Sequence, residues 1–346
     1  MNRFRIALLA VVVLVAAVVI LTVVRPPMPP SLSSSASASL QPAAQRVPAP
    51  DFTGIDGWLN TQPLTLQSLK GHVVLIDFWT FSCVNCVRTL PHLADLYGRF
   101  KRRGLVIVGV HSPEFDFEKD RGNVAAAVRR LGVTWPVAID SQMATWNAYS
   151  NQYWPAEYLL DQQGRIAYVH YGEGDYDVTD QAVAALLGVS AAGGAAGTPV
   201  PNDITPELYA GSERGQLADG AGYGQPGVPT AYPDPGPPAQ SDAIQVTGSW
   251  IDEGQYLQAA SAGHVRLRFH ADSVYVVAGT AGGDLSASVL IDGAPLGARA
   301  GPALLGSTLT VARQDLYQLL QGESSGLHVI DLAVPAGFRI YTFTFG

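Results

Sequence analysis

The feature that most constrains the fold of this 346-residue chain is the alternation of strand-like and helix-like segments between residues 51 and 188. Apolar runs of strand length, such as HVVLIDFW (72–79) and LVIVGVH (105–111), are each followed by a stretch with helical periodicity. The last two strand-like runs, AEYLLD and RIAYVHYG, are joined by the turn QQG. The alternation predicts a three-layer α/β domain over residues 49–188, with a hairpin that adds an antiparallel edge to its sheet.

A different pattern follows residues 189–202, which are rich in Ala and Gly and predict a linker. Residues 203–346 begin with loops rich in Gly and Pro and continue with short period-2 runs, including HVRLRFH, SVYVVAG and RIYTFTFG. Short strands at close spacing with few helical patterns are typical of an antiparallel β-sandwich or jelly roll. We therefore expect an all-β second domain.

The N-terminus combines two arginines within residues 1–5 with an uncharged apolar run over residues 6–24. A helix of that length spans about 28 Å, close to the ~30 Å hydrocarbon core of a bilayer. The run predicts a transmembrane signal anchor with residues 1–5 on the cytoplasmic side; a signal cleaved near ASA (36–38) is the alternative. Residues 25–48, rich in Pro, Ser and Ala, predict a linker. Both domains are then expected on the extracytoplasmic face of the cell membrane, periplasmic or extracellular.

Net charge and cysteine count exclude several classes of protein. The chain has 21 Lys plus Arg against 29 Asp plus Glu, a formal net charge of -8, whereas nucleic-acid binders normally present a basic face. Two cysteines in total exclude a disulfide-stapled miniprotein. A disulfide between them would close a very short ring and remove little chain entropy, so stapling is a poor reason for the pair.

Both cysteines lie in DFWTFSCVNCVRTLP (77–91), where an apolar strand gives way to a helix. Unpaired backbone N–H groups and the positive end of the helix dipole favour the thiolate form of Cys83. Cys86 lies one turn further into the helix, is better shielded and is predicted to be the resolving thiol. In the expected cycle a mixed disulfide with the partner protein forms at Cys83, and Cys86 then releases the reduced partner. The redox-active group is the Cys83–Cys86 disulfide, and no other cofactor is expected.

The motif is also compatible in principle with a metal site or a peroxidase. A structural zinc site usually takes four ligands, and the sequence has no second C-x-x-C to accompany His92 or His111, so we predict no metal. Thr80 stands three residues before Cys83, as in the P-x-x-x-T-x-x-C motif of peroxiredoxins. Ile76 occupies that motif's proline position, so the match fails.

The surroundings of the dithiol resemble the thioredoxin superfamily. Asp77, six residues before Cys83, stands at the position of the family's buried acid, which helps to deprotonate the second cysteine. A carboxyl within VVLIDFW is expected to be desolvated and to have a raised pKa, with a partly exposed strand-end Asp as the alternative. Pro91, five residues after Cys86, stands where the family has the proline that kinks the helix.

The resemblance also implies a substrate-binding edge. Pro155 precedes the hairpin strand, the location of the family's cis-proline, which faces the dithiol and receives the substrate backbone; Pro136 is the competing proline. Trp154 and Ser82 are expected to contact the substrate, Ser82 standing where the family usually has tryptophan. Glu157 is expected either to point toward the dithiol and tune it or to be a surface acid.

Longer stretches are similar to the exported part of the DipZ family over residues 50–346, including FTGIDGWLNTQPLTLQSLKGHVVLIDFW near the start and GSWIDEGQYLQ and FRIYTFTFG in the second half. The resemblance implies a TlpA-like thioredoxin domain followed by a β-sandwich like carbohydrate-binding modules. Members often carry an N-terminal multi-span electron-transfer domain, which the printed sequence does not contain. We therefore expect a separate membrane electron donor.

A glycan ligand of the second domain would stack on aromatic side chains, for which the candidates are Trp250, Tyr256, Tyr275 and Tyr317. Packing in the core or between the domains is the favoured alternative, because each of the four lies in or near an apolar strand-like run.

The sequence thus predicts a membrane-anchored thiol-disulfide oxidoreductase that acts on protein thiols and disulfides. The alternative is an envelope adaptor that binds glycan or protein and carries a vestigial redox domain. The direction of electron flow stays open, because Val84-Asn85 replaces the Gly-Pro pair of thioredoxin and the intervening pair strongly tunes the potential.

Overall fold

The computed structural model describes residues 40–191, 204–322 and 326–346. The predicted anchor over residues 6–24 lies outside these ranges. Among the helices of the described residues, none combines the length and the apolar character needed to cross a membrane. Residues 38–346 belong to one structural unit, and within it the chain forms an α/β domain followed by a β-domain.

The α/β domain is built on a six-stranded sheet with the order β1-β4-β3-β2-β5-β6. Its strands are β1 (Gly57–Leu59), β2 (Val73–Trp79), β3 (Leu105–His111), β4 (Val137–Ile139), β5 (Ala156–Leu160) and β6 (Ile166–Tyr171). Strand β2 pairs parallel with β3 and antiparallel with β5, and β5 and β6 form the predicted hairpin. Only β1, a three-residue strand, was not predicted.

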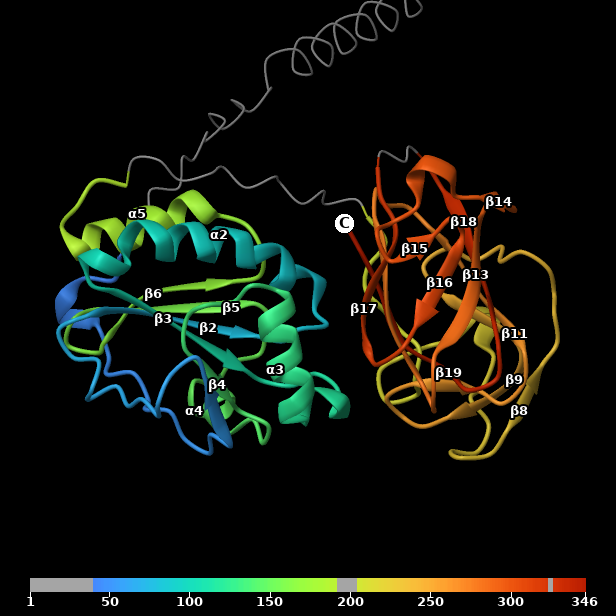
Figure 1. Cartoon of the computed structure of the whole chain (residues 1–346), viewed down its shortest axis with the longest axis horizontal. Helices are drawn as coiled ribbons and strands as arrows, with labels where there is room; N and C mark the ends of the chain where they lie inside the picture. The colour runs from blue at the N-terminus through green and yellow to red at the C-terminus, as the bar shows by residue number, and fades with distance from the viewer. Residues whose placement is uncertain (1–39, 192–203, 323–325) are drawn as a thin grey trace, which may run out of the picture. The chain divides into compact units, whose positions relative to one another are not determined.

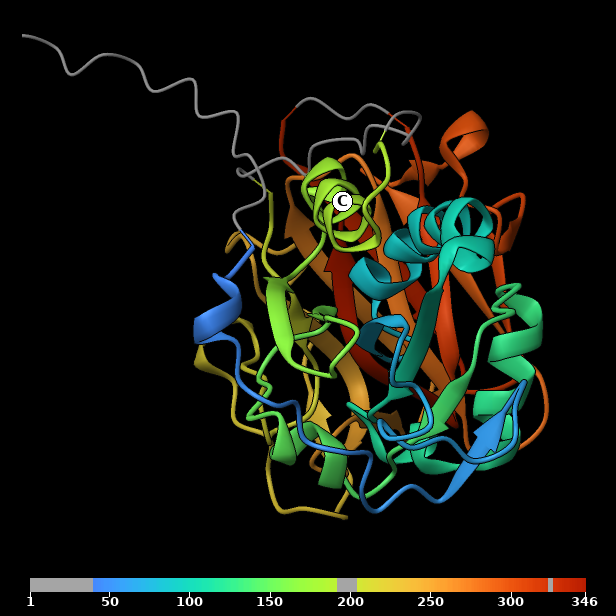
Figure 2. The same cartoon turned by 90° about the vertical axis from the view of Figure 1, so that its left-hand side faces the viewer.

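Helices α2 and α5 lie side by side on one face of this sheet (Figures 1 and 2). The helices are α2 (Val84–Phe100), α3 (Arg121–Arg130), α4 (Ala144–Ala148) and α5 (Tyr176–Leu187), with short 3-10 turns η1 (Ala43–Gln45), η2 (Lys101–Arg103) and η3 (Asp116–Lys119). Leu75 and Trp79 of β2 pack in the core cluster that contains Cys86 of α2, whereas Ile76 and Phe78 pack on the opposite face with Trp146 of α4. Since side chains alternate along a strand, Asp77 points to the face that carries α2.

Residues 40–48, expected to belong to the linker, follow the edge of the sheet at β6. The Gln41 N–H donates to the Ala167 carbonyl at 2.8 Å, and Arg46 pairs with Asp161 at 3.2 Å. Residues 40–48 therefore pack on the α/β domain.

The described residues of the β-domain form thirteen strands, and all pairings between these strands are antiparallel. They are β7 (Leu208–Tyr209), β8 (Thr230–Tyr232), β9 (Ile244–Asp252), β10 (Leu257–Ala259), β11 (Gly263–Phe269), β12 (Val274–Thr280), β13 (Leu285–Ile291), β14 (Ala294–Pro295), β15 (Leu304–Leu305), β16 (Thr308–Val311), β17 (Asp315–Leu320), β18 (His328–Val334) and β19 (Phe338–Phe345), with 3-10 turns η4 (Ala218–Gly220) and η5 (Gly297–Arg299). The first half of β9 pairs with β11 and its second half with β10, so this strand belongs to both layers of a sandwich.

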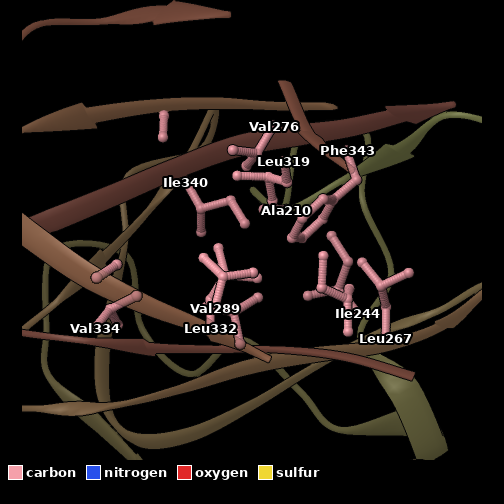
Figure 3. Packing of buried hydrophobic residues seen from close by; sticks show 14 of the residues in the cluster. Ala210, Ile244, Leu267, Val276, Val289, Leu319, Leu332, Val334, Ile340 and Phe343 are labelled. Carbon is pink, nitrogen blue, oxygen red and sulfur yellow. The ribbon is translucent and has the colours of Figure 1, made fainter. Parts of the chain in front are cut away.

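Apolar side chains from the two layers meet in the middle of the β-domain (Figure 3). Ile340 and Phe343 of β19 face Val289 of β13 and Leu332 of β18, and all four are fully buried. The predicted all-β second domain is confirmed, because the period-2 runs of the sequence are strands whose alternate side chains fill this core.

The four aromatic candidates for a glycan site take part mainly in packing. Trp250 is 1% exposed in the sandwich core, Tyr317 packs against that core, and Tyr256 lies against Tyr341 with ring centroids 4.8 Å apart. Tyr275 interacts with Arg88 of α2. Packing in the core or between domains accounts for these side chains.

Candidate active site

The two cysteines lie at the beginning of α2, with Cys83 as the N-cap residue. The Cys86 N–H donates to Cys83 Sγ at 3.2 Å, and the two sulfurs lie 2.6 Å apart as free thiols. Cys83 is partly exposed and Cys86 is 1% exposed. Burial, reinforced by the contact with Cys83, raises the pKa of the Cys86 thiol. A partner can therefore reach Cys83 first, and Cys86 needs help to lose its proton.

Asp77 supplies a carboxyl on the face of the sheet covered by α2. It is 1% exposed, and its Oδ1 atom has no hydrogen-bond partner among the described residues. Burial raises the pKa of Asp77 well above its usual value, and the charge of Glu157 raises it further. The charge of Asp77 in turn contributes to the raised pKa of Cys86, so the two groups interact electrostatically. The partly exposed alternative for Asp77 is wrong.

The Trp154–Pro155 bond is the one cis peptide bond among the described residues, and Pro136 is not in a cis bond. Pro155 directly precedes β5, which pairs with β2. Trp154 Nε1 donates to the Ser112 carbonyl at 3.0 Å, and Trp154 and Cys83 line the same pocket, which has a volume of about 440 Å³. The structure thus brings Cys83, Cys86 and Trp154 to one site.

Residues 46–169 match the AhpC/TSA family, and residues 205–346 match the family described as the thioredoxin like C-terminal domain. Over 316 residues the chain is 37% identical to Protein DipZ of Mycobacterium tuberculosis, an alignment that covers 86% of this chain and 43% of DipZ. The chain is a homologue of the DipZ proteins. It spans less than half the length of the curated DipZ proteins that it matches.

Two further matches cover about two fifths of this chain. The chain is 28% identical to the thiol-disulfide oxidoreductase YkuV of Bacillus subtilis over 142 residues, which cover 41% of this chain and 95% of YkuV. The solution structure of a thioredoxin-like protein in the oxidized form aligns at 29% identity with a TM-score of 0.39, covering 41% of this chain and 96% of that one. The sequence matches are thus to proteins named DipZ and thiol-disulfide oxidoreductase.

Glu157 was expected either to point toward the dithiol and tune it, as a substrate-binding residue, or to be a surface acid; it is not at the surface and does not line the pocket. It is 2% exposed, and Thr179 of α5 donates a hydrogen bond to its Oε2 atom at 2.9 Å. In the sheet register Glu157 is paired with Asp77 of β2 on one side and His170 of β6 on the other. The helices on this face exclude solvent, so Glu157 can tune Asp77 but cannot bind a substrate.

Ser82 was also predicted to contact the substrate, and this prediction is wrong. Its side chain is 1% exposed because the hydroxyl turns inward and donates to Glu118 Oε1 at 2.5 Å; the Ser82 N–H donates to the same oxygen at 3.3 Å. Glu118 itself is 0% exposed. Sequence reasoning missed Glu118, since a glutamate within FDFEKD has the pattern of a solvated turn.

The pocket beside Cys83 has a second wall from the β-domain, formed by residues 204–207, Tyr209, Thr344 and Phe345. Tyr209 Oη lies 2.8 Å from Glu114 Oε1 and 2.9 Å from Glu207 Oε2. A phenol has a single hydrogen, so both contacts are hydrogen bonds only when one carboxyl is protonated. Loss of hydration, together with the charge of Glu114, raises the pKa of Glu207 to about 7, which is consistent with such sharing.

The two histidines weighed as metal ligands have other neighbours. His111 is fully buried, lies 3.3 Å from Thr80 Oγ1 through Nε2, and has its pKa lowered to about 3 by burial. His92 stacks on Tyr176 with ring centroids 4.4 Å apart. The described residues contain no group of three or more His, Cys, Asp or Glu arranged to hold a metal ion.

Proposed function

We propose that the protein is a membrane-anchored, extracytoplasmic thiol-disulfide oxidoreductase that exchanges electrons with protein partners through Cys83 and Cys86. The observation that carries the proposal is the pairing of a partly exposed Cys83, which opens into a pocket, with a buried Cys86 directly behind it. An exposed nucleophile backed by a shielded second thiol is the arrangement that thiol-disulfide exchange requires.

In the reducing direction, the Cys83 thiolate attacks one sulfur of a partner disulfide. The partner's S–S bond breaks, its leaving sulfur takes a proton, and a mixed disulfide joins Cys83 to the partner. The Cys86 thiol then gives its proton to Asp77, and its sulfur attacks Cys83. The mixed disulfide breaks, and the second partner sulfur leaves as a thiol. Two electrons have passed to the partner, and Cys83–Cys86 ends as a disulfide; the reverse sequence oxidises a partner.

The pocket of about 440 Å³ is the proposed binding site for the partner's cysteine-containing segment. Its size suits a short extended piece of chain rather than a folded surface. Trp154 lines the pocket, and the adjacent Pro155 is proposed to receive the partner backbone, as in the superfamily.

The membrane anchor and the electron donor are further parts of the proposal. The apolar length of residues 6–24 supports a single-pass anchor that holds both domains outside the cytoplasm. A separate membrane protein is proposed to recharge the dithiol. A glycan ligand is not included, because the aromatic side chains that could stack on a sugar are engaged in packing.

The decisive experiment is mixed-disulfide trapping. Cys83→Ser should reduce exchange with a model protein disulfide to the uncatalysed background, because no accessible thiolate is left. Cys86→Ser should still attack and accumulate covalent adducts, visible on non-reducing gels. If both variants exchanged at the unmutated rate, the proposal would fail and the adaptor function would gain support.

The direction of transfer needs a separate measurement. Equilibration of the dithiol with a series of glutathione buffers gives its reduction potential. A value near about -270 mV indicates a reductant and one near about -120 mV an oxidant.

A further inference from the structure

Residues 114–118 link the dithiol loop to the β-domain. The segment includes the first three residues of η3 and lies between β3 and α3. Its C-terminal end holds Ser82, the residue before Cys83, and its other residues contact the β-domain. No local sequence signal indicates either contact, since Ser82 and Glu118 are 36 residues apart.

Glu118 uses both carboxylate oxygens. Oε1 accepts from Ser82 Oγ at 2.5 Å and from Ser82 N–H at 3.3 Å. Oε2 accepts from the N–H groups of Glu114 at 2.6 Å and Phe115 at 3.0 Å, which closes the turn. A fully buried carboxylate that accepts four hydrogen bonds holds its donors in place, because moving any of them away leaves buried polar groups unpaired.

The other residues of the segment face the β-domain. Glu114 Oε1 pairs with Arg214 at 2.8 Å, in addition to its contact with Tyr209, and the Asp116 N–H donates to the Gln255 side chain at 2.9 Å.

Phe115, which is 1% exposed, packs edge-on against Tyr341 of β19 with ring centroids 5.2 Å apart, and Phe117 lies 5.0 Å from the same ring. Four consecutive residues therefore contact the β-domain, and the fifth holds Ser82.

We propose that the β-domain positions the redox loop through residues 114–118, and that Glu118 is the positioning residue that fixes Ser82 and so the backbone presenting Cys83. The inference rests on the proposed function, since it assigns the β-domain a part in the same dithiol site. The β-domain would then have a role other than ligand binding. Its residues Tyr341, Tyr209 and Arg214 contact residues 114–117, and Glu118 at the end of the segment binds the dithiol loop.

The contact with Ser82 depends on the protonation state of Glu118. Three of the four donors are N–H groups that cannot accept, so a protonated carboxyl keeps the Ser82 hydroxyl only as an acceptor and weakens its bonds to the N–H groups, including that of Ser82. Burial and the charge of Glu114 raise the pKa of Glu118 to about 7, while hydrogen bonds from Ser82, Thr80 and the Phe115 N–H act in the opposite sense.

Two other titratable groups lie nearby: Glu207, which contacts Tyr209 beside Glu114 and has its pKa raised to about 7, and His111. His111, next to Thr80, is kept neutral because burial lowers its pKa to about 3. The hydrogen bonds from Ser82 to ionised Glu118 should therefore be present above pH 7 and be weakened as the pH falls through that value.

The test measures the alkylation rate of Cys83 by iodoacetamide between pH 5 and 9, with Cys86→Ser in every protein so that a single thiol reacts. This readout requires no partner protein. In the protein that carries Cys86→Ser alone, the plot of alkylation rate against pH should show an inflection near pH 7 in addition to the one caused by ionisation of the reacting thiol. Glu118→Gln should remove this inflection and slow alkylation at pH 8 by about tenfold, the change expected for loss of one hydrogen bond to a charged group.

Three further variants isolate the contacts. Ser82→Ala removes the loop-side hydroxyl with little change of volume and should also abolish the inflection, so it decides the question if Glu118→Gln does not fold. Tyr341→Ala acts from the β-domain and should slow alkylation by about threefold, less than loss of the carboxylate itself. Arg130→Ala is the matched control: it breaks another contact between the domains, with Asp315 at 2.7 Å, but does not involve the segment.

An unchanged profile in both Glu118→Gln and Ser82→Ala overturns the role of Glu118. A normal rate in Tyr341→Ala, or an equal loss in Arg130→Ala, overturns the role of the β-domain. Failure of the unmutated protein to exchange with any protein disulfide would count against the proposed function instead, and the alkylation profile would still decide this inference.

Discussion

The two domains bury their polar groups in different ways. In the α/β domain, buried atoms of Asp77, His92, His111 and Asp180 have no hydrogen-bond partner among the described residues. In the β-domain such atoms belong to Tyr223, Gln245 and Thr344, none of which is a carboxyl or an imidazole. Buried carboxyl and imidazole groups with at least one unpaired atom are therefore found in the domain that carries the dithiol, although Asp180 also pairs with Arg99 and His111 contacts Thr80.

The buried carboxylates of the β-domain are paired. Asp252 accepts from the N–H groups of Ser212 and Gly254, both at 3.1 Å, and Asp315 pairs with Arg130 and Arg313. An unpaired buried carboxyl costs free energy of folding, whereas a paired one costs less. The comparison indicates that the unpaired Asp77 near Cys86 lowers the stability of the α/β domain, whereas the β-domain contains no such unpaired carboxyl among its described residues.

The largest expected effect is on the sandwich core. Leu332→Ala removes a fully buried side chain of β18 and should lower the free energy of unfolding by about 2–5 kcal/mol. Urea unfolding followed by circular dichroism measures it. The matched control is Leu305→Ala, since that leucine is 88% exposed in the same domain. Equal losses in the two variants would show that the sandwich is not well packed.

The next effect concerns chemistry. Asp77→Asn removes the proton acceptor beside Cys86 and should slow release of the mixed disulfide by about 100-fold at pH 7. Quenched-flow mass spectrometry of a preformed adduct measures this step.

The same substitution should change stability in the opposite direction. The pKa of Asp77 is raised in the folded state, so ionisation destabilises the fold. Wild type and Asp77→Asn should be equally stable below the ordinary carboxyl pKa of about 3.9, and the variant should become the more stable as the pH rises. Asp56→Asn, at an exposed position, is the control. A variant less stable than wild type at pH 8 would contradict the view that Asp77 is retained at a cost.

The smallest effect is expected at an exposed ion pair of the α/β domain. Lys119 and Asp116 lie 2.6 Å apart, but their side chains are 48% and 70% exposed. Lys119→Ala should change the free energy of unfolding by less than about 0.5 kcal/mol, because solvent screens such pairs. Thermal unfolding at two salt concentrations checks this. A larger loss would mean that surface charge stabilises the domain more than the comparison allows.

The parts of the fold that could be predicted are those encoded locally. β2, the start of α2, Pro91 within it and the β5–β6 hairpin follow from apolar runs and turn residues within short windows. The positions of Asp77 and Pro155 relative to the cysteines are likewise fixed by spacing along the chain. Strand β9 was missed because its two halves pair with different strands, so its apolar pattern does not follow a single face.

The parts of the site that could not be predicted depend on pairing between distant segments. Ser82 has the composition of a loop residue, and its burial is decided by a carboxylate 36 residues away. Glu157 resembles a surface strand acid until α5 is placed over it, with Thr179 as its donor. The second wall of the pocket comes from a different domain, which no periodicity within residues 49–188 can indicate.

The aromatic contact of Phe115 and Phe117 with Tyr341 also bears on how the protein can be handled. The two phenylalanine rings stack with centroids 5.8 Å apart and are covered by the β-domain. A fragment ending before residue 204 would present both rings to water as an adjoining apolar patch. Such a fragment should self-associate at concentrations where the two-domain protein stays monodisperse, and detergent or Phe115→Ser should be needed to keep it in solution.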